Sequence, residues 1–285
     1  MSPSAQQSRY GRARRLLPAL TLALLCVLAV SLVGCGSNQV PLQLSLRVTG
    51  PGGLSKALSA KDLSALPQAQ ALYTSVNNWP SAKQYAAKGI SVTGLLKQLQ
   101  IKAGTVVTFE AKDGYQVALT YEQLTQTRYS FAGGKRVKVE PILAYNYAQD
   151  ATSLGQMKTQ GTLTLVFGQQ NATEHTNPAF ISGVERITIS DAVPSWQPPT
   201  IFPSSAIVSA GETVKLVAPD AGQSFVYYTL DGSTPTISSK LYNPSTYQPQ
   251  LNKPIPITQD TTIKAITIGY GKDPSSVATF QVKVR

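Results

Sequence analysis

Residues 225–236 read FVYYTLDGSTPT, and this stretch decides the fold of the C-terminal part of the chain. Its aromatic and β-branched run predicts a strand, and Asp231-Gly232 directly after the run predicts a hairpin turn. Similar short strand patterns recur on both sides of it, at residues 213–217, 261–267 and 278–284. Short strands separated by turn clusters, without a helical pattern, predict that residues 200–285 form an all-β antiparallel sandwich.

The same region resembles the immunoglobulin- or fibronectin-like β-sandwich at the C-terminus of chitobiase and β-hexosaminidase. The resemblance is carried by Tyr227–Thr236, Leu241-Tyr242, Ile257-Thr258, Thr261–Ile266 and Gly269–Ser275. It implies a non-catalytic module. In this context Asp231 is interpreted as a turn residue rather than an acid or a calcium ligand.

Five tyrosines of this region admit two interpretations. They are Tyr227, Tyr228, Tyr242, Tyr247 and Tyr270. Alternating tyrosines in a sandwich favour core and edge packing, whereas exposed rings would be able to stack on sugars.

Residues 191–199 form a proline-rich linker that includes Pro194, Pro198 and Pro199. Repeated proline favours extended polyproline II structure. We therefore expect a semi-rigid spacer between the sandwich and the preceding domain.

Residues 42–190 predict a mixed α+β domain. Leu42, Leu44, Leu46 and Val48 alternate as one face of a half-buried strand, and residues 92–99 place apolar residues at helical spacing. Ser59 is the expected N-cap of a short helix. Lys112-Asp113-Gly114 predicts a hairpin turn between strands at 106–111 and 116–120.

The order of short segments in this domain resembles the molybdopterin-binding domain of the sulfite oxidase family. The segments are LSLRVTGPGGLSKALSAKDLSAL at 44–66, GISVTGLLKQL at 89–99, VTFEAKDGYQVAL at 107–119 and GTLTLVFGQQ to ISGVERITI within 161–189. The resemblance implies a cleft that in active members holds the pterin and its molybdenum through a cysteine thiolate.

Serine stands where that cysteine would be. The matching stretch is Ser75-Val76-Asn77-Asn78-Trp79, and the chain has no cysteine after Cys35. We therefore expect no catalytic residue, no metal site and no cofactor, with molybdopterin as the alternative. The resemblance makes Ser75, Asn78 and His175 the candidate residues of the cleft.

His175 is the only histidine, and it lies in the polar stretch Thr173–Asn177. It is expected to be an exposed loop residue; the alternative is a contact to an anion at the mouth of the cleft. A serine hydrolase is disfavoured, because no Gly-x-Ser-x-Gly motif supplies a nucleophile.

The N-terminus predicts export. Four arginines precede an apolar run at residues 16–33, which ends in Leu32-Val33-Gly34-Cys35. That ending resembles the lipobox of bacterial lipoproteins, which implies cleavage between Gly34 and Cys35, a diacylglyceryl group on Cys35 and residues 36–41 as a tether. The alternative is an uncleaved transmembrane helix. Both alternatives place the rest of the chain outside the cytoplasm, at the bacterial cell membrane.

Charge is distributed unevenly along the chain. The net charge is +6 over residues 36–190 and +1 over residues 191–285. An exported protein is not expected to bind nucleic acid. The basic domain instead suggests attraction to an anionic envelope polymer, or to a surface protein.

These observations favour a surface-anchored lipoprotein that has no catalytic activity of its own and serves binding or display at the cell surface. Two alternatives stay open: an extracytoplasmic molybdopterin-dependent oxidoreductase, and an accessory carbohydrate-binding protein.

The lipobox predicts that Cys35→Ala abolishes lipid attachment and leaves the chain uncleaved at Gly34, because the thioether forms on that sulfur. Radiolabelled fatty acid and the electrophoretic mobility of the chain report both events. Equal label in the wild type and in Cys35→Ala would contradict the assignment, and Cys26→Ala is the matched control.

Overall fold

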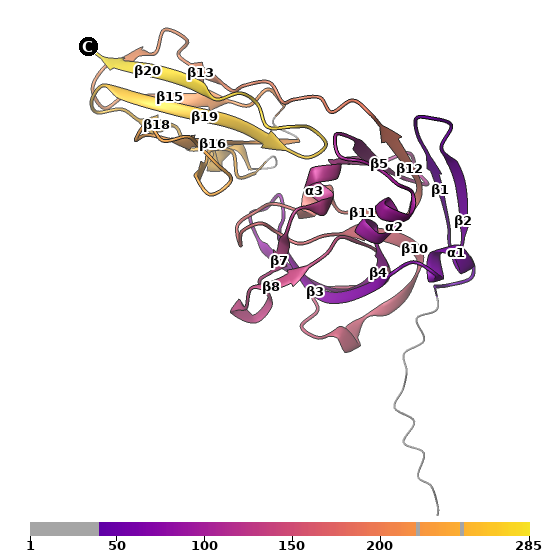
Figure 1. Cartoon of the computed structure of the whole chain (residues 1–285). Coiled ribbons are helices and arrows are strands. Elements are labelled where there is room, and N and C mark those ends of the chain that lie inside the picture. The colour runs from indigo at the N-terminus through magenta and orange to yellow at the C-terminus, as the bar shows by residue number, and fades with distance from the viewer. Residues whose placement is uncertain (1–39, 221–222, 246–247) are drawn as a thin grey trace, which may run out of the picture. The chain divides into compact units, whose positions relative to one another are not determined.

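A computed structural model describes residues 40–220, 223–245 and 248–285 (Figure 1). Gly34, Cys35 and Tyr247 lie outside these residues. Within the described ranges, no helix is both long enough and apolar enough to cross a bilayer.

The first domain contains a five-stranded sheet in the order β2-β1-β12-β5-β6. Its strands are β1 (Ser45–Thr49), β2 (Ser55–Ser59), β5 (Val106–Ala111), β6 (Gln116–Thr120) and β12 (Val184–Ser190). Strand β1 runs parallel to β12, and the other neighbours are antiparallel. The expected hairpin between β5 and β6 is confirmed.

The alternation predicted for the first strand holds for three of its four residues. Leu44, Leu46 and Val48 are buried, whereas Leu42 is 94% exposed. The expectation for Leu42 is wrong because β1 begins only at Ser45, after a turn in which the Leu44 amide donates to the Pro41 carbonyl.

A second five-stranded sheet has the order β11-β10-β9-β4-β3. Its strands are β3 (Gln68–Val76), β4 (Ala82–Ser91), β9 (Ile142–Gln149), β10 (Lys158–Val166) and β11 (Ile181–Ser182). The pairing of β4 with β9 shifts register between Lys88 and Gly89. A Cβ at Gly89 would lie 2.1 Å from the Leu143 carbonyl oxygen, so this close approach requires glycine.

A separate two-stranded ribbon joins β7 (Arg128–Ser130) to β8 (Val137–Val139). The basic residues 135–138 lie on it and are exposed, as the alternating pattern of Lys135 to Lys138 leads one to expect for a solvated hairpin. Arg128, at the start of β7, is instead 1% exposed.

Helices are short and begin at capping residues. They are α1 (Ala60–Ser64), α2 (Val92–Gln98) and α3 (Tyr121–Thr125), with 3₁₀ turns η1 (Ala132–Gly134), η2 (Leu154–Gln156) and η3 (Asn177–Ala179). Ser59 caps α1 as predicted, in a capping box with Asp62. Thr120 and Gln123 form the same motif at α3.

Both sheets and the helices contribute to one apolar core. It includes Leu46 and Ile187 from the first sheet, Ile90 and Leu165 from the second, and Leu95 from α2. A smaller cluster around Tyr73 lies on the second sheet. The domain is mostly β with a few short helices, which confirms the mixed α+β expectation.

The second domain has a three-stranded sheet, β13-β15-β18, and a five-stranded sheet, β14-β20-β19-β16-β17. The strands are β13 (Thr200–Phe202), β14 (Ile207–Val208), β15 (Thr213–Val217), β16 (Ser224–Thr229), β17 (Lys240–Leu241), β18 (Ile255–Pro256), β19 (Thr261–Gly269) and β20 (Ala278–Val284), with 3₁₀ turn η4 (Pro249–Leu251). The expected sandwich is confirmed, although β14 pairs with β20 in parallel.

Within this sandwich, Tyr227 and Tyr242 are buried and Tyr228 packs against the core. These three rings therefore follow the packing interpretation. Asp231 Oδ1 accepts hydrogen bonds from Ser233 N (3.0 Å) and Ser233 Oγ (2.6 Å), so it is a turn residue as expected. The turn opens a loop that reaches β17 only at Lys240, which is longer than a two-residue hairpin.

The proline-rich linker is held by the second domain. Trp196 is 4% exposed, its backbone N–H donates to the Asp273 carbonyl (2.9 Å), and the Lys272 ammonium lies 4.1 Å from its ring centroid. A Cβ at Gly269 would lie 2.8 Å from that ring. The linker is therefore anchored at Trp196, where the indole ring gains apolar burial against the end of β19. That the linker acts as a semi-rigid spacer stays a prediction.

Candidate functional site

Ser75, one of the three candidate residues, is buried at the end of β3. Its hydroxyl oxygen accepts hydrogen bonds from Thr176 Oγ1 (2.8 Å) and from the backbone N–H of Asn177, and the side chain is 1% exposed. Both lone pairs of the hydroxyl oxygen thus accept hydrogen bonds from the loop between β10 and β11. This oxygen offers no open position to a metal ion.

The loop over Ser75, residues 167–180, is fixed by Gln169. The Gln169 side chain donates to the Glu174 carbonyl (2.9 Å) and accepts from Thr74 Oγ1 (2.6 Å). Its backbone exchanges hydrogen bonds with Tyr129 on β7. A polar side chain that is 1% exposed and fully hydrogen bonded gives the loop one conformation.

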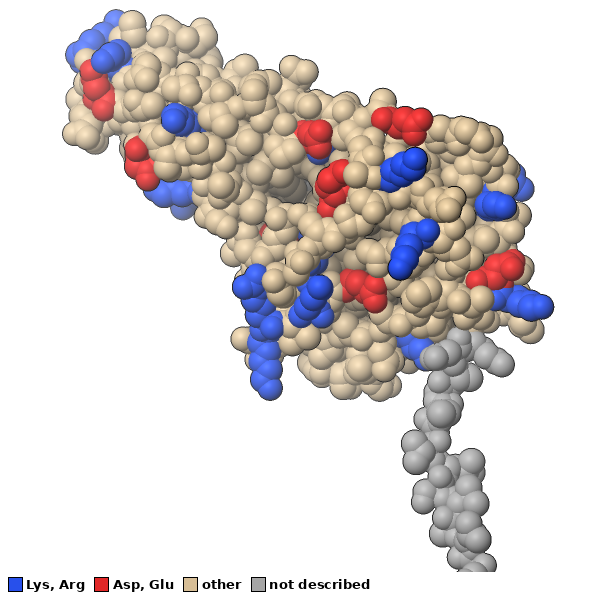
Figure 2. Space-filling model, viewed as in Figure 1, with Lys and Arg blue, Asp and Glu red and all other residues tan. Residues whose placement is uncertain are grey.

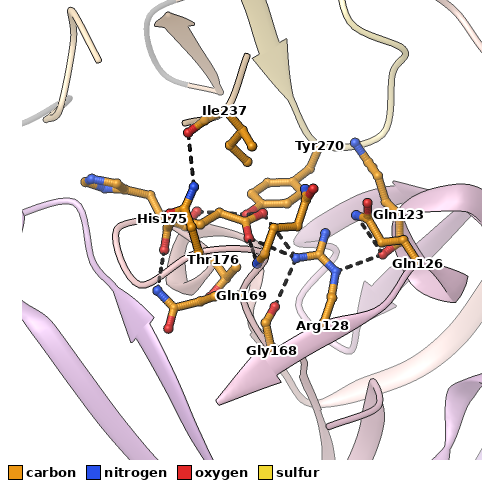
Figure 3. A network of polar contacts seen from close by, with 12 residues as sticks. Gln123, Gln126, Arg128, Gly168, Gln169, His175, Thr176, Ile237 and Tyr270 are labelled. Atoms are coloured by element: carbon orange, nitrogen blue, oxygen red, sulfur yellow. Dashed lines mark hydrogen bonds and ion pairs between the residues drawn. The ribbon is translucent and has the colours of Figure 1, made fainter. Parts of the chain in front are cut away.

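Glu174 of this loop forms a buried ion pair with Arg128 of β7. Arg128 Nη1 is 3.1 Å from Glu174 Oε1, and the two side chains are 1% and 5% exposed. Arg128 also donates to the carbonyls of Gly168 (2.9 Å) and Gln123 (3.0 Å), and its guanidinium lies 4.9 Å from the Phe167 ring centroid (Figure 3). Partners on several sides compensate the loss of water around both charges.

Tyr270 of the second domain completes the network. It follows β19, and its hydroxyl lies within hydrogen-bond distance of Glu174 Oε1 (3.3 Å) and the His175 carbonyl (3.0 Å). Its ring packs edge-on against Phe167, with centroids 5.6 Å apart. Burial raises the pKa of Tyr270 well above 10, so the hydroxyl keeps its proton.

Gln123 joins α3 to the same loop of the second domain. Its side-chain amide donates to the Gly269 carbonyl (2.8 Å), and its Oε1 accepts from the Gly271 N–H (2.9 Å) while capping α3 at Thr120 (3.0 Å). Gly271 has φ +74°, and a Cβ there would lie 2.7 Å from that of Ala118. Asn171 adds a further link through a hydrogen bond to the Ile237 carbonyl (3.1 Å).

His175 is buried, which corrects the expectation of an exposed loop histidine. It is 4% exposed, and its ring lies 5.1 Å from that of Phe225 in the second domain. Burial lowers the pKa of His175 to about 4, with a hydrogen bond to the Asn77 backbone acting in the opposite direction. In Figure 3 its ring points away from Arg128. A neutral, buried imidazole is poorly suited to the proposed anion contact.

Asn78, the third candidate, lines a cavity of about 450 Å³ together with residues of both domains. Its backbone carbonyl accepts a hydrogen bond from Ser245 Oγ. Ser75 and His175 belong to one buried loop region, whereas Asn78 faces a solvent-accessible groove. The three candidates therefore do not form a single site.

Arg128, Glu174 and Tyr270 were not among the candidates. Arg128 and Glu174 are 46 residues apart in sequence, and no local pattern links them. Two sequence patterns mark residues of this network. One is the capping-box spacing of Thr120 and Gln123, and the other is a tyrosine flanked by two glycines at 269–271.

The charged and titratable groups of this network hold one another in place. The carboxylate of Glu174 is paired with Arg128, and the phenol of Tyr270 holds its proton. Among the described residues, no group of three His, Cys, Asp or Glu side chains could hold a metal ion.

Two comparisons with known proteins found a likeness, one for most of the second domain and one for the greater part of the chain. The family model described as "Fn3 associated" matches residues 214–282. Among solved structures, the sulfane dehydrogenase SoxCD from Paracoccus pantotrophus is similar at 11% sequence identity, with a TM-score of 0.34 over 86% of this chain and 77% of that chain. No curated protein matches the sequence. Residues 214–282 are therefore similar to Fn3-associated domains.

Removing the charge of Glu174 should be costly. Glu174→Gln leaves Arg128 buried without a counter-charge, so we expect the free energy of unfolding to fall by about 3–5 kcal/mol. Chemical denaturation measures it. The matched control is Asp260→Asn, which breaks the exposed pair with Lys283 and should lower the stability much less, because water screens this pair. Equal effects of the two substitutions would contradict the role assigned to the buried pair.

His175 predicts a pH dependence of stability. Its pKa is lowered from 6.5 to about 4 in the folded chain, so the unfolded chain takes up the proton first as pH falls. Stability from this residue is complete above pH 6.5 and is lost between pH 6.5 and about 4. In the variant His175→Gln this part of the dependence should vanish. Parallel stability–pH curves for the two proteins would contradict the assignment.

Proposed function

We propose that this chain is a non-catalytic binding or display protein of the bacterial surface, held to the membrane by lipid on Cys35. In it, a sulfite oxidase-like domain has been converted into a platform for a chitobiase-type C-terminal sandwich. The single observation that carries the proposal is the burial of Ser75 under the loop of residues 167–180. The oxygen that would face molybdenum is hydrogen bonded to Thr176 and Asn177 instead.

The residues around Ser75 do not fit a molybdenum centre. A thiolate is a strong anionic donor, whereas a serine hydroxyl needs a nearby positive charge to ionise. The contacts of the Ser75 hydroxyl are with Thr176, Asn177 and the Val76 carbonyl, all uncharged. The chemistry of this donor set therefore argues against a pterin-dependent oxidoreductase.

The position of the second domain supports the same conclusion. Tyr270 and Phe225 cover the loop that carries Glu174 and His175. In a domain that bound a cofactor beneath this loop, the loop would need to admit it. Here the loop is an interface between the two domains, which suits a scaffold.

The basic surface of the first domain makes an anionic envelope polymer, or an acidic surface protein, the proposed partner of the platform. Residues 36–190 carry a net charge of +6, against +1 for residues 191–285. On the face seen in Figure 2, lysine and arginine side chains are scattered among acidic ones and form no continuous patch. Any such attraction would be diffuse and weakened by salt.

Metal analysis tests the proposal. Protein purified from molybdenum-replete cells should contain no stoichiometric molybdenum or pterin, because Ser75 is the wrong donor and is already hydrogen bonded. Mass spectrometry of the metal measures this, with Ser75→Ala as the matched variant and a cysteine-containing sulfite oxidase from the same cells as the positive control. About one molybdenum per chain, lost in Ser75→Ala, would replace the proposal with the oxidoreductase alternative.

A further inference from the structure

A groove between the two domains has a lining unlike that of the other large cavities among the described residues. Its volume is about 450 Å³, within the range of roughly 300–1,000 Å³ that small-molecule sites occupy. It is lined by three aromatic rings and three side-chain amides, those of Tyr115, Phe225, Tyr270, Asn78, Gln116 and Gln223.

No charged residue lines this groove. Two other cavities of the first domain differ in this respect: one is lined by Arg47, Lys112 and Arg186 with two glutamates, the other by Lys97, Lys138 and Glu140. An ionic ligand would find no counter-charge in the interdomain groove. A purely apolar ligand would cover the side-chain amides without offering them hydrogen bonds, which is costly.

The aromatic residues of the groove differ in how much of each side chain is exposed. Phe225 is 8% exposed and forms a buried wall, while Tyr115 is 54% exposed. Tyr115 is positioned by the β5–β6 hairpin, where its N–H donates to Asp113 Oδ1 (3.0 Å) and its carbonyl accepts from Ala111 N (2.9 Å). An exposed ring on a fixed turn can stack on a ligand at little conformational cost.

The polar lining is also held in place. Gln116 Nε2 donates to Glu110 Oε2 (3.0 Å), and Ser245 of the second domain donates to the Asn78 carbonyl. Tyr270 is fixed through its hydroxyl by Glu174 and the His175 carbonyl. Because both domains supply lining residues, the groove exists only while they are docked.

We propose that this groove binds a neutral oligosaccharide. Sugar rings present apolar C–H faces to aromatic side chains and hydroxyls to amides, which can both donate and accept. The proposal rests on the proposed binding function and adds a second, neutral ligand class to the anionic partner proposed for the basic surface. It places recognition at the domain junction rather than on the tyrosines of the sandwich core.

Calorimetric titration of the full mature chain tests it, with two neutral probes: the β-1,4-linked tetramers of N-acetylglucosamine and of glucose. We expect at least one to bind, with a Kd that changes less than about twofold between low and high salt, because no charge lines the groove. Tyr115→Ala should weaken binding about tenfold or more, and Tyr115→Phe should retain it, since the ring carries the contact.

The matched control is Phe202→Ala, which removes an aromatic ring that is 63% exposed on β13 and does not line the groove. Its Kd should equal that of the wild type. Absence of binding to both tetramers at millimolar concentration, or equal weakening by Tyr115→Ala and Phe202→Ala, would overturn the inference. Either result is distinct from failure of the proposed function, which is decided by the molybdenum content.

Discussion

The rest of the site depends on the buried pair of Arg128 and Glu174. Two opposite charges away from water are stable only if each keeps its partners, so every group around them is constrained. Gly168 and Gln123 supply carbonyls to the guanidinium, and Tyr270 reaches the carboxylate from the second domain. One electrostatic requirement thus fixes the 167–180 loop, the end of α3 and the docking of the sandwich at once.

The same requirement accounts for the surroundings of Ser75 and His175. When the loop follows Glu174 down to Arg128, the next residues, Thr176 and Asn177, reach Ser75 and take its hydroxyl. His175 turns towards Phe225 and loses its contact with water. The surroundings of these two side chains are thus set by contacts between distant segments of the chain.

Local patterns in the sequence predicted local structure well. The Asp113-Gly114 turn, the cap at Ser59 and the helix at residues 92–98 follow from interactions within a few residues. The prediction for Leu42 was wrong because an alternating pattern does not show at which residue strand pairing begins. The ion pair, the burial of His175 and the docking of Trp196 join distant segments. No spacing rule predicts contacts between residues that are 46 or 95 positions apart in the sequence.

The contact between Gly271 and Ala118 has an evolutionary consequence. The space for one extra methyl group at residue 271 is missing, since a Cβ there would meet that of Ala118 at 2.7 Å. A larger side chain at one position could be accepted only if the domains separated slightly, which would pull Tyr270 from Glu174. In homologous chains that keep the two domains docked, the residues at these two positions should therefore change together. In chains whose domains are not docked, each position should change independently.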